Sequence, residues 1–153
     1  MIMKKISDFL KAGILIPALF LLLGGCGPST PDSPLPLRPF DTQVNLFSPK
    51  YSELHTKKWV YVSGIGLKGV IIRKISEFEY RVFERNCTYL PNDDSCNKVN
   101  VDPSGLFMYD PCGECGSRFE WTGRPTQGQA SQYLFRYSTE LLNNGKVLRI
   151  FYN

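Results

Sequence analysis

Apolar and polar residues alternate along much of the second half of the chain. In residues 76–86, Phe78, Tyr80 and Val82 are separated by charged residues. Successive side chains of a β-strand point to opposite faces, so this alternation predicts a strand with one buried face. β-Branched and aromatic residues predict two earlier strands, within residues 58–66 and 69–76. No segment of this part of the chain shows helical periodicity.

Turn signals divide the remaining residues into short antiparallel strands. Within residues 98–110, the sequence Asp102-Pro103-Ser104-Gly105 separates two short strands, because proline presets φ and glycine permits a positive φ. Asn144-Gly145 predicts a type I′ hairpin turn near the C-terminus. Residues 138–142 are compatible with a strand or a short turn of helix. Many short strands with such turns predict an all-β, antiparallel sandwich or small barrel.

The N-terminal pattern is different and indicates export. Lysines precede an apolar run over residues 12–23, which is followed by Gly24, Gly25 and Cys26. Residues 1–25 therefore read as a secretory signal, with an apolar run too short to span a bilayer of about 30 Å comfortably. A cysteine after two glycines resembles the lipobox of bacterial lipoproteins, which implies that Cys26 is lipidated. The alternative is an ordinary secretory signal or an anchor helix with an incidental cysteine.

The residues after Cys26 predict a tether followed by one domain. Residues 27–40 include five prolines, a composition that favours extended conformations. Residues 26–57 are thus expected to be the lipidated N-terminus and tether, and residues 58–153 a single β domain. Two or more acyl chains on Cys26 would give stable anchoring. The expected location is outside the cytoplasm, on a membrane of the bacterial cell envelope.

Charge and composition exclude several functions. The formal net charge is +4 with no basic run, so nucleic acid is not an expected partner. The one histidine, His55, precedes the first predicted strand and is expected at the surface. No Ser/His/Asp set is available, and Asp93-Asp94 lies in a polar turn where solvation explains it. The sequence therefore favours a protein that is not an enzyme.

Four cysteines carry the candidate chemistry: Cys87 and Cys96 in one predicted loop, Cys112 and Cys115 in another. If two hairpin ends face each other, four thiolates could hold Zn²⁺ in a closed site or an iron–sulfur centre. Outside the cytoplasm they could equally form two disulfides, within the loops or between them. Within loops, Cys87 would pair with Cys96 and Cys112 with Cys115. Free redox-active thiols are the third alternative, although a thioredoxin-like context is absent.

Three short motifs in order resemble a Rieske domain: "CTY" at 87–89, "CGECGSRF" at 112–119 and "GQA" at 128–130. That family binds a [2Fe–2S] cluster through a Cys-x-His and a Cys-x-x-His loop. The resemblance runs from about residue 59 to the C-terminus and implies a Rieske-like fold. It aligns Cys87 and Cys112 with the cysteine ligands, Tyr89 and Cys115 with the two histidines, and Gly116 and Ser117 with residues that support the cluster loop. Both histidine ligands are therefore replaced.

The resemblance leaves two functions open. The favoured one is a structural or interaction module with an unknown protein partner, in which disulfides replace the cluster. Some family members join an extra cysteine from each loop in a disulfide, and Cys96 matches the first of these, whereas Glu114 stands at the second. The other function is electron transfer to an unknown redox partner. Its cluster would be held by Cys87, Cys112, Cys115 and either Cys96 or Tyr89, at a potential nearer that of plant-type ferredoxins.

Overall fold

The computed structural model describes residues 35–91 and 98–153. The described residues belong to one compact unit. The predicted signal segment, the predicted lipidation site Cys26 and the loop cysteine Cys96 lie outside the described residues. Within the described ranges, no helix has both the length and the apolar composition that crossing a membrane requires.

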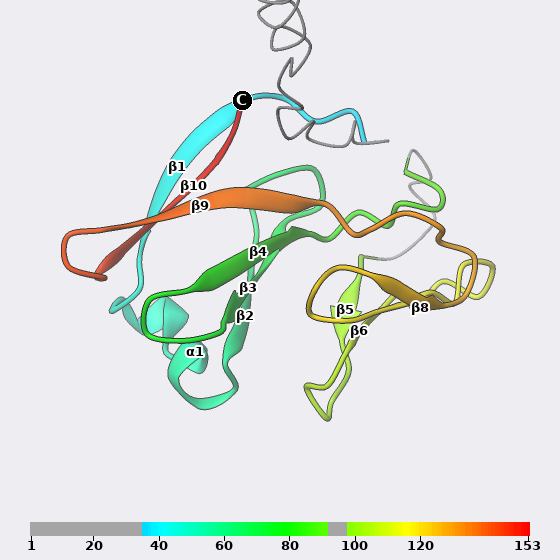
Figure 1. Ribbon diagram of the computed structural model, residues 1–153, viewed down its shortest axis with the longest axis horizontal. Coiled ribbons are helices and arrows are strands. Elements are labelled where there is room, and N and C mark those ends of the chain that lie inside the picture. The colour runs from blue at the N-terminus through cyan, green and yellow to red at the C-terminus, as the bar shows by residue number, and fades with distance from the viewer. Residues whose placement is uncertain (1–34, 92–97) are drawn as a thin grey trace, which may run out of the picture. The chain divides into compact units, whose positions relative to one another are not determined.

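Six strands form the larger sheet, in the order β1-β10-β9-β4-β3-β2 (Figure 1). Every pairing in it is antiparallel. Its strands are β1 (Phe40–Asn45), β2 (Trp59–Val62), β3 (Val70–Lys74), β4 (Tyr80–Glu84), β9 (Arg136–Leu142) and β10 (Val147–Tyr152). The C-terminal strand is therefore internal, between β1 and β9.

Four shorter strands form a second antiparallel sheet, in the order β5-β6-β7-β8. They are β5 (Asn100–Val101), β6 (Met108–Tyr109), β7 (Arg118–Phe119) and β8 (Pro125–Gln127). This sheet contains the hairpin that bears Cys112 and Cys115, between β6 and β7. The two sheets confirm the predicted all-β, antiparallel fold.

The larger sheet is buried on both faces at its β3 strand. Val70 and Ile72 pack into one core cluster, with residues of β1, β10 and the helical segment before β2. Ile71, between them, belongs to a second cluster that includes Met108 and Phe119 of the smaller sheet. Because neighbouring strand residues face opposite ways, a continuous apolar run is what a strand buried on both faces requires. The second cluster also contains Cys87 and Cys115.

The folded unit begins earlier than residue 58, which corrects the predicted boundary of the tether. Strand β1 pairs with β10 from Phe40↔Tyr152 to Asn45↔Val147. A 3-10 turn, η2 (Pro49–Tyr51), and one turn of helix, α1 (Glu53–Thr56), follow it. Tyr51 and Leu54 are buried in the first core cluster. β1 lies at the edge of the sheet, so most of its side chains stay polar and the strand pattern is weak in the sequence.

Two local predictions had different outcomes. Phe78 is 88 % exposed and lies in the β3–β4 turn, so its assignment to the buried face of a strand was wrong. The C-terminal hairpin is confirmed, because Asn144 and Gly145 have φ values of 55° and 82°, and Lys146 donates its N–H to the Asn143 carbonyl at 3.2 Å. Residues 138–142 belong to strand β9 rather than to a helix.

Candidate functional site

The loop between β6 and β7 is a tight turn that places Cys115 in the interior. The N–H groups of Cys115 and Gly116 donate to the carbonyl of Cys112, at 3.1 and 2.9 Å. Asp110 Oδ1 accepts the N–H of Cys112 at 2.9 Å. Gly116 has a φ of 55°, a conformation that favours glycine. These hydrogen bonds to the Cys112 carbonyl and to the Asp110 carboxylate thus fix the path of the loop.

The loop after β4 carries Cys87 from the larger sheet towards β5 of the smaller one. Its first residues are anchored by a buried carboxylate, because Asn86 donates its N–H to Glu84 Oε1 at 2.9 Å. The Asn86 side chain donates to the Pro91 carbonyl at 2.7 Å. Thr88 donates to the Gln132 carbonyl at 3.1 Å. The Cys87 backbone is therefore held on both sides.

The segment 128–130 packs directly on the Cys115 loop. Gln129 donates its N–H to the Cys115 carbonyl at 3.1 Å, and Ala130 donates to Ser117 Oγ at 2.9 Å. Gly128 has a φ of 87°, and a Cβ at this position would lie 2.5 Å from Ser117 Cα. Only glycine permits that approach without a backbone shift. The three segments singled out in the sequence, around residues 87, 115 and 128, thus meet at one place.

Cys87 and Cys115 form a buried pair of free thiols. Their Sγ atoms lie 3.3 Å apart, and the residues are 4 % and 3 % exposed. Cys115 Sγ also donates to Ser117 Oγ at 3.0 Å. The backbone N–H of Tyr89 lies near enough to the Cys87 sulfur to lower the pKa of that thiol. Each sulfur therefore has its own polar neighbour as well as the other sulfur.

Asp110 completes a group of three metal-ligating side chains. The Sγ atoms of Cys87 and Cys115 and a carboxylate oxygen of Asp110 all lie within 4.8 Å of one another. Asp110 is 3 % exposed, and its Oδ2 has no hydrogen-bond partner in the described part of the chain. A buried carboxylate oxygen without a partner is costly, and a cation would satisfy it. This group could hold a metal ion.

The surroundings of Cys87 favour its neutral form in the absence of a cation. Burial raises the pKa of this thiol far above its usual value, and the neighbouring Asp110 carboxylate and Cys115 raise it further. The N–H of Tyr89 acts in the opposite direction but is outweighed. Without a cation, Cys87 is therefore a neutral thiol at pH 7, and it is not an activated nucleophile.

Cys112 differs from Cys87 and Cys115, because it is disulfide-bonded. Cys87 and Cys115 are both free, so neither of them is its partner. The expected set of two disulfides among the four cysteines, whether within the loops or between them, is therefore wrong, because each such arrangement requires Cys87 and Cys115. The CxxC spacing misled because the turn directs Cys115 into the core, whereas Cys112 is only half-buried.

Two other predicted positions lie away from the donor group. The Tyr89 side chain is 39 % exposed, and what this residue contributes to Cys87 is its backbone N–H. His55 is exposed on α1, with its ring 6.0 Å from that of Phe47, which confirms its expected surface position. Asp110 was missed in the sequence, where the available signal was an acidic residue directly after the apolar stretch "GLFMY".

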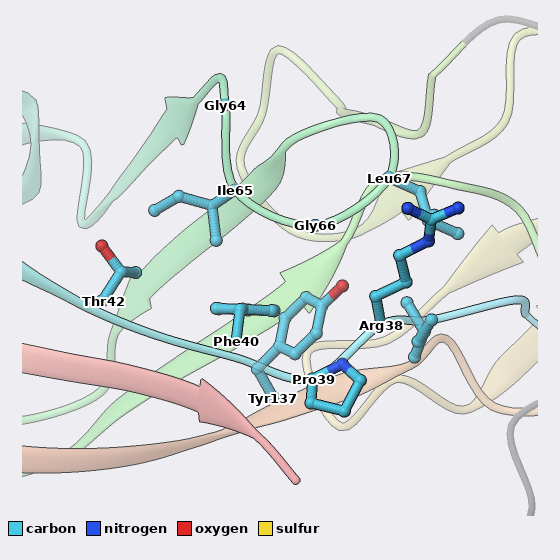
Figure 2. Close-up of a pocket in the computed structure, with 10 residues that line it drawn as sticks. Arg38, Pro39, Phe40, Thr42, Gly64, Ile65, Gly66, Leu67 and Tyr137 are labelled. Atoms are coloured by element: carbon cyan, nitrogen blue, oxygen red, sulfur yellow. The ribbon is translucent and has the colours of Figure 1, made fainter.

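A cavity of about 300 Å³ lies elsewhere, beside β1 and the loop after β2 (Figure 2). Its lining is mainly apolar and includes Phe40, Ile65 and Leu67, with Arg38 and Tyr137 also contributing. No thiol or carboxylate lines it. The cavity is thus separate from the cysteine group and lacks its chemistry.

Comparison with known proteins returned no match among family models, curated proteins or solved structures. The function is therefore inferred from the geometry and the sequence patterns of this chain.

Proposed function

We propose that this chain is a membrane-tethered, extracytoplasmic lipoprotein whose domain is a non-enzymatic structural or interaction module. The observation that carries the proposal is the disulfide of Cys112. Disulfides persist in oxidising compartments and are rare in the cytoplasm, in agreement with the export signal and the lipobox-like Cys26. A disulfide at this loop also does mechanically what a cluster would do, because it restrains the loop.

The domain is further proposed to be a degenerate Rieske-like module. Support comes from the meeting of the three motifs: Ser117 accepts from both Cys115 and Ala130, and Gly128 approaches the Ser117 backbone closely. Gly116 and Ser117 align with residues that support the cluster loop in Rieske domains. In this chain they shape the loop around Cys115. The supporting architecture is kept, and the two histidine ligands are replaced.

The alternative function, electron transfer by a [2Fe–2S] cluster, is less well supported. It requires Cys112 as a ligand together with Cys87, Cys115 and either Cys96 or Tyr89. The disulfide of Cys112 would first have to be reduced. The same requirement applies to a Zn²⁺ site made of four thiolates. The proposed module needs no such change.

Iron and sulfide analysis of the full chain tests this choice. The protein is exported with iron in excess, extracted from membranes anaerobically in detergent, alkylated without reductant and digested. We expect no acid-labile sulfide and no alkylation of Cys112. Stoichiometric iron with acid-labile sulfide, and alkylation of Cys112 after acid release of the iron, would establish the electron-transfer alternative instead.

A further inference from the structure

We propose that Cys87, Cys115 and Asp110 bind one Zn²⁺ ion. This site differs from the four-thiolate site and from the cluster, because it excludes Cys112 and includes a carboxylate. It does not depend on the lipid anchor or on the Rieske-like relationship. It rests on the position of three buried side chains from two loops and on the unpartnered oxygen of Asp110.

The donor set fits zinc better than other common metals. Thiolate sulfur and carboxylate oxygen are both established zinc ligands, whereas calcium and magnesium take oxygen ligands. Copper(I) is selected by soft ligands, and the Asp110 carboxylate is a hard one. Two thiolates and one carboxylate carry three negative charges, which a divalent cation reduces to one. Zinc therefore removes most of the charge that burial penalises.

The distance between the two Sγ atoms is closer to that of two thiolates on one metal ion than to the S–S distance of a disulfide. Two thiolates at about 2.3 Å from a tetrahedral zinc ion lie about 3.8 Å apart. The Sγ atoms of a disulfide lie about 2.05 Å apart. The observed distance between Cys87 Sγ and Cys115 Sγ is 3.3 Å, so the pair needs to open by only about 0.5 Å to admit zinc.

Each ligand already has a second partner that would orient it. Asp110 Oδ1 is held by the Cys112 N–H, which leaves Oδ2 for the metal. The backbone N–H of Tyr89 favours the thiolate form of Cys87. Ser117 Oγ accepts the N–H of Ala130 and donates its proton to the Cys115 carbonyl at 3.4 Å, and this proton would turn to Cys115 Sγ once the thiol is deprotonated. Such outer contacts are a regular feature of metal sites.

Binding would connect the two sheets without any redox change. Cys87 follows β4 of the larger sheet, whereas Asp110 and Cys115 belong to the β6–β7 connection of the smaller one. Zinc binds the thiolates, so two thiol protons pass to solvent for each ion bound. Three protein ligands leave the fourth tetrahedral position to a non-protein donor. Since the unfolded chain lacks the preformed site, zinc stabilises the folded state by mass action.

Cobalt substitution tests the site on the full chain. The protein is purified anaerobically in detergent without reductant, stripped with a chelator and titrated with Co²⁺, followed by displacement with Zn²⁺. We expect one cobalt per chain, a thiolate-to-cobalt charge-transfer band, and loss of that band when zinc is added. Zinc should also protect Cys87 and Cys115 from alkylation in the wild-type chain, a measurement that needs no variant.

Matched substitutions identify the ligands. Cys115→Ser should reduce the intensity of the charge-transfer band, because only the Cys87 thiolate remains, and Asp110→Asn should weaken zinc binding at least about tenfold. Glu114→Gln removes an exposed carboxylate from the same loop and should leave binding unchanged. Substoichiometric cobalt without the band, or a disulfide between Cys87 and Cys115 in the anaerobic protein, would overturn the proposal. Equal zinc affinity for Asp110→Asn and Glu114→Gln would also overturn the three-ligand site. The iron and sulfide result for the proposed function is independent of these outcomes.

Discussion

The hydroxyl of Tyr137 donates a hydrogen bond to Glu84 Oε2 across 2.7 Å in the interior of the domain. Glu84 is fully buried, and its carboxylate also accepts the N–H groups of Leu67, Lys68 and Asn86. Hydrogen bonds to the charged form are what make a buried carboxylate tolerable. This one residue therefore fixes the loop before β3 and the start of the Cys87 loop.

Replacing Glu84 with glutamine should destabilise the fold by about 1–3 kcal/mol, because the amide group presents donors where backbone N–H groups need acceptors. The free energy of unfolding in urea measures the effect. Glu79→Gln is the control, since the Glu79 side chain is 52 % exposed and its loss should cost less than about 0.5 kcal/mol. Equal effects of the two substitutions would contradict the anchoring role of Glu84.

Gly128→Ala should disturb the packing on the Cys115 loop. The new Cβ would lie 2.5 Å from Ser117 Cα, in addition to the cost of about 1–2 kcal/mol of an L-residue at positive φ. Gly145→Ala is a matched control, because Gly145 has a similar φ of 82° but open space around its Cβ position. Urea unfolding should show a larger loss for Gly128→Ala. A loss no larger than that of Gly145→Ala would mean that the loop relaxes freely.

The pairing of β1 with β10 should become sensitive to acid. The side-chain hydrogen bond from Arg149 lowers the pKa of Asp41 in the folded state, although burial opposes this. The resulting stabilisation is present above the unfolded pKa of Asp41 and is lost as pH falls through the lower folded pKa. Wild type should therefore exceed Asp41→Asn in urea midpoint at about pH 6, and the difference should shrink at about pH 2. A difference that stays constant would exclude the ion pair as its cause.

Cys26→Ser should release the chain from the membrane fraction, because serine cannot carry the thioether-linked lipid. Immunoblotting of membrane and soluble fractions after export measures this. Ser29→Ala, three residues along the tether, is the control and should stay with the membrane. Retention of Cys26→Ser in the membrane fraction would contradict the lipoprotein assignment and favour an uncleaved anchor helix.

The parts of the fold that depend on local chemistry were predictable from the sequence. Asn144 and Gly145 specify their turn through the φ values they tolerate, and the apolar run of β3 identifies a buried strand. Strand β1 was not predictable in the same way, because this edge strand carries polar side chains at its exposed positions and so lacks a clear apolar pattern. Phe78 misled because it continues an alternating pattern into a turn whose position depends on the β3–β4 register.

The candidate site was predictable only as a set of cysteines. Their division into a bonded Cys112 and a free pair, Cys87 with Cys115, depends on which side chains the β6–β7 turn directs inward. Cys87 and Cys115 are 28 residues apart in sequence, so no local pattern reports their contact. Asp110 could not be singled out, because the burial of its Oδ2 without a hydrogen-bond partner is visible only in the folded loop.

Native mass spectrometry of the anaerobically isolated full chain tests the central claim most directly. Masses before and after alkylation report bound metal, disulfides and free thiols in one sample. We expect one zinc ion per chain and one disulfide, with Cys87 and Cys115 alkylated only after the zinc is removed. A metal-free chain with a second disulfide joining Cys87 to Cys115 would contradict it.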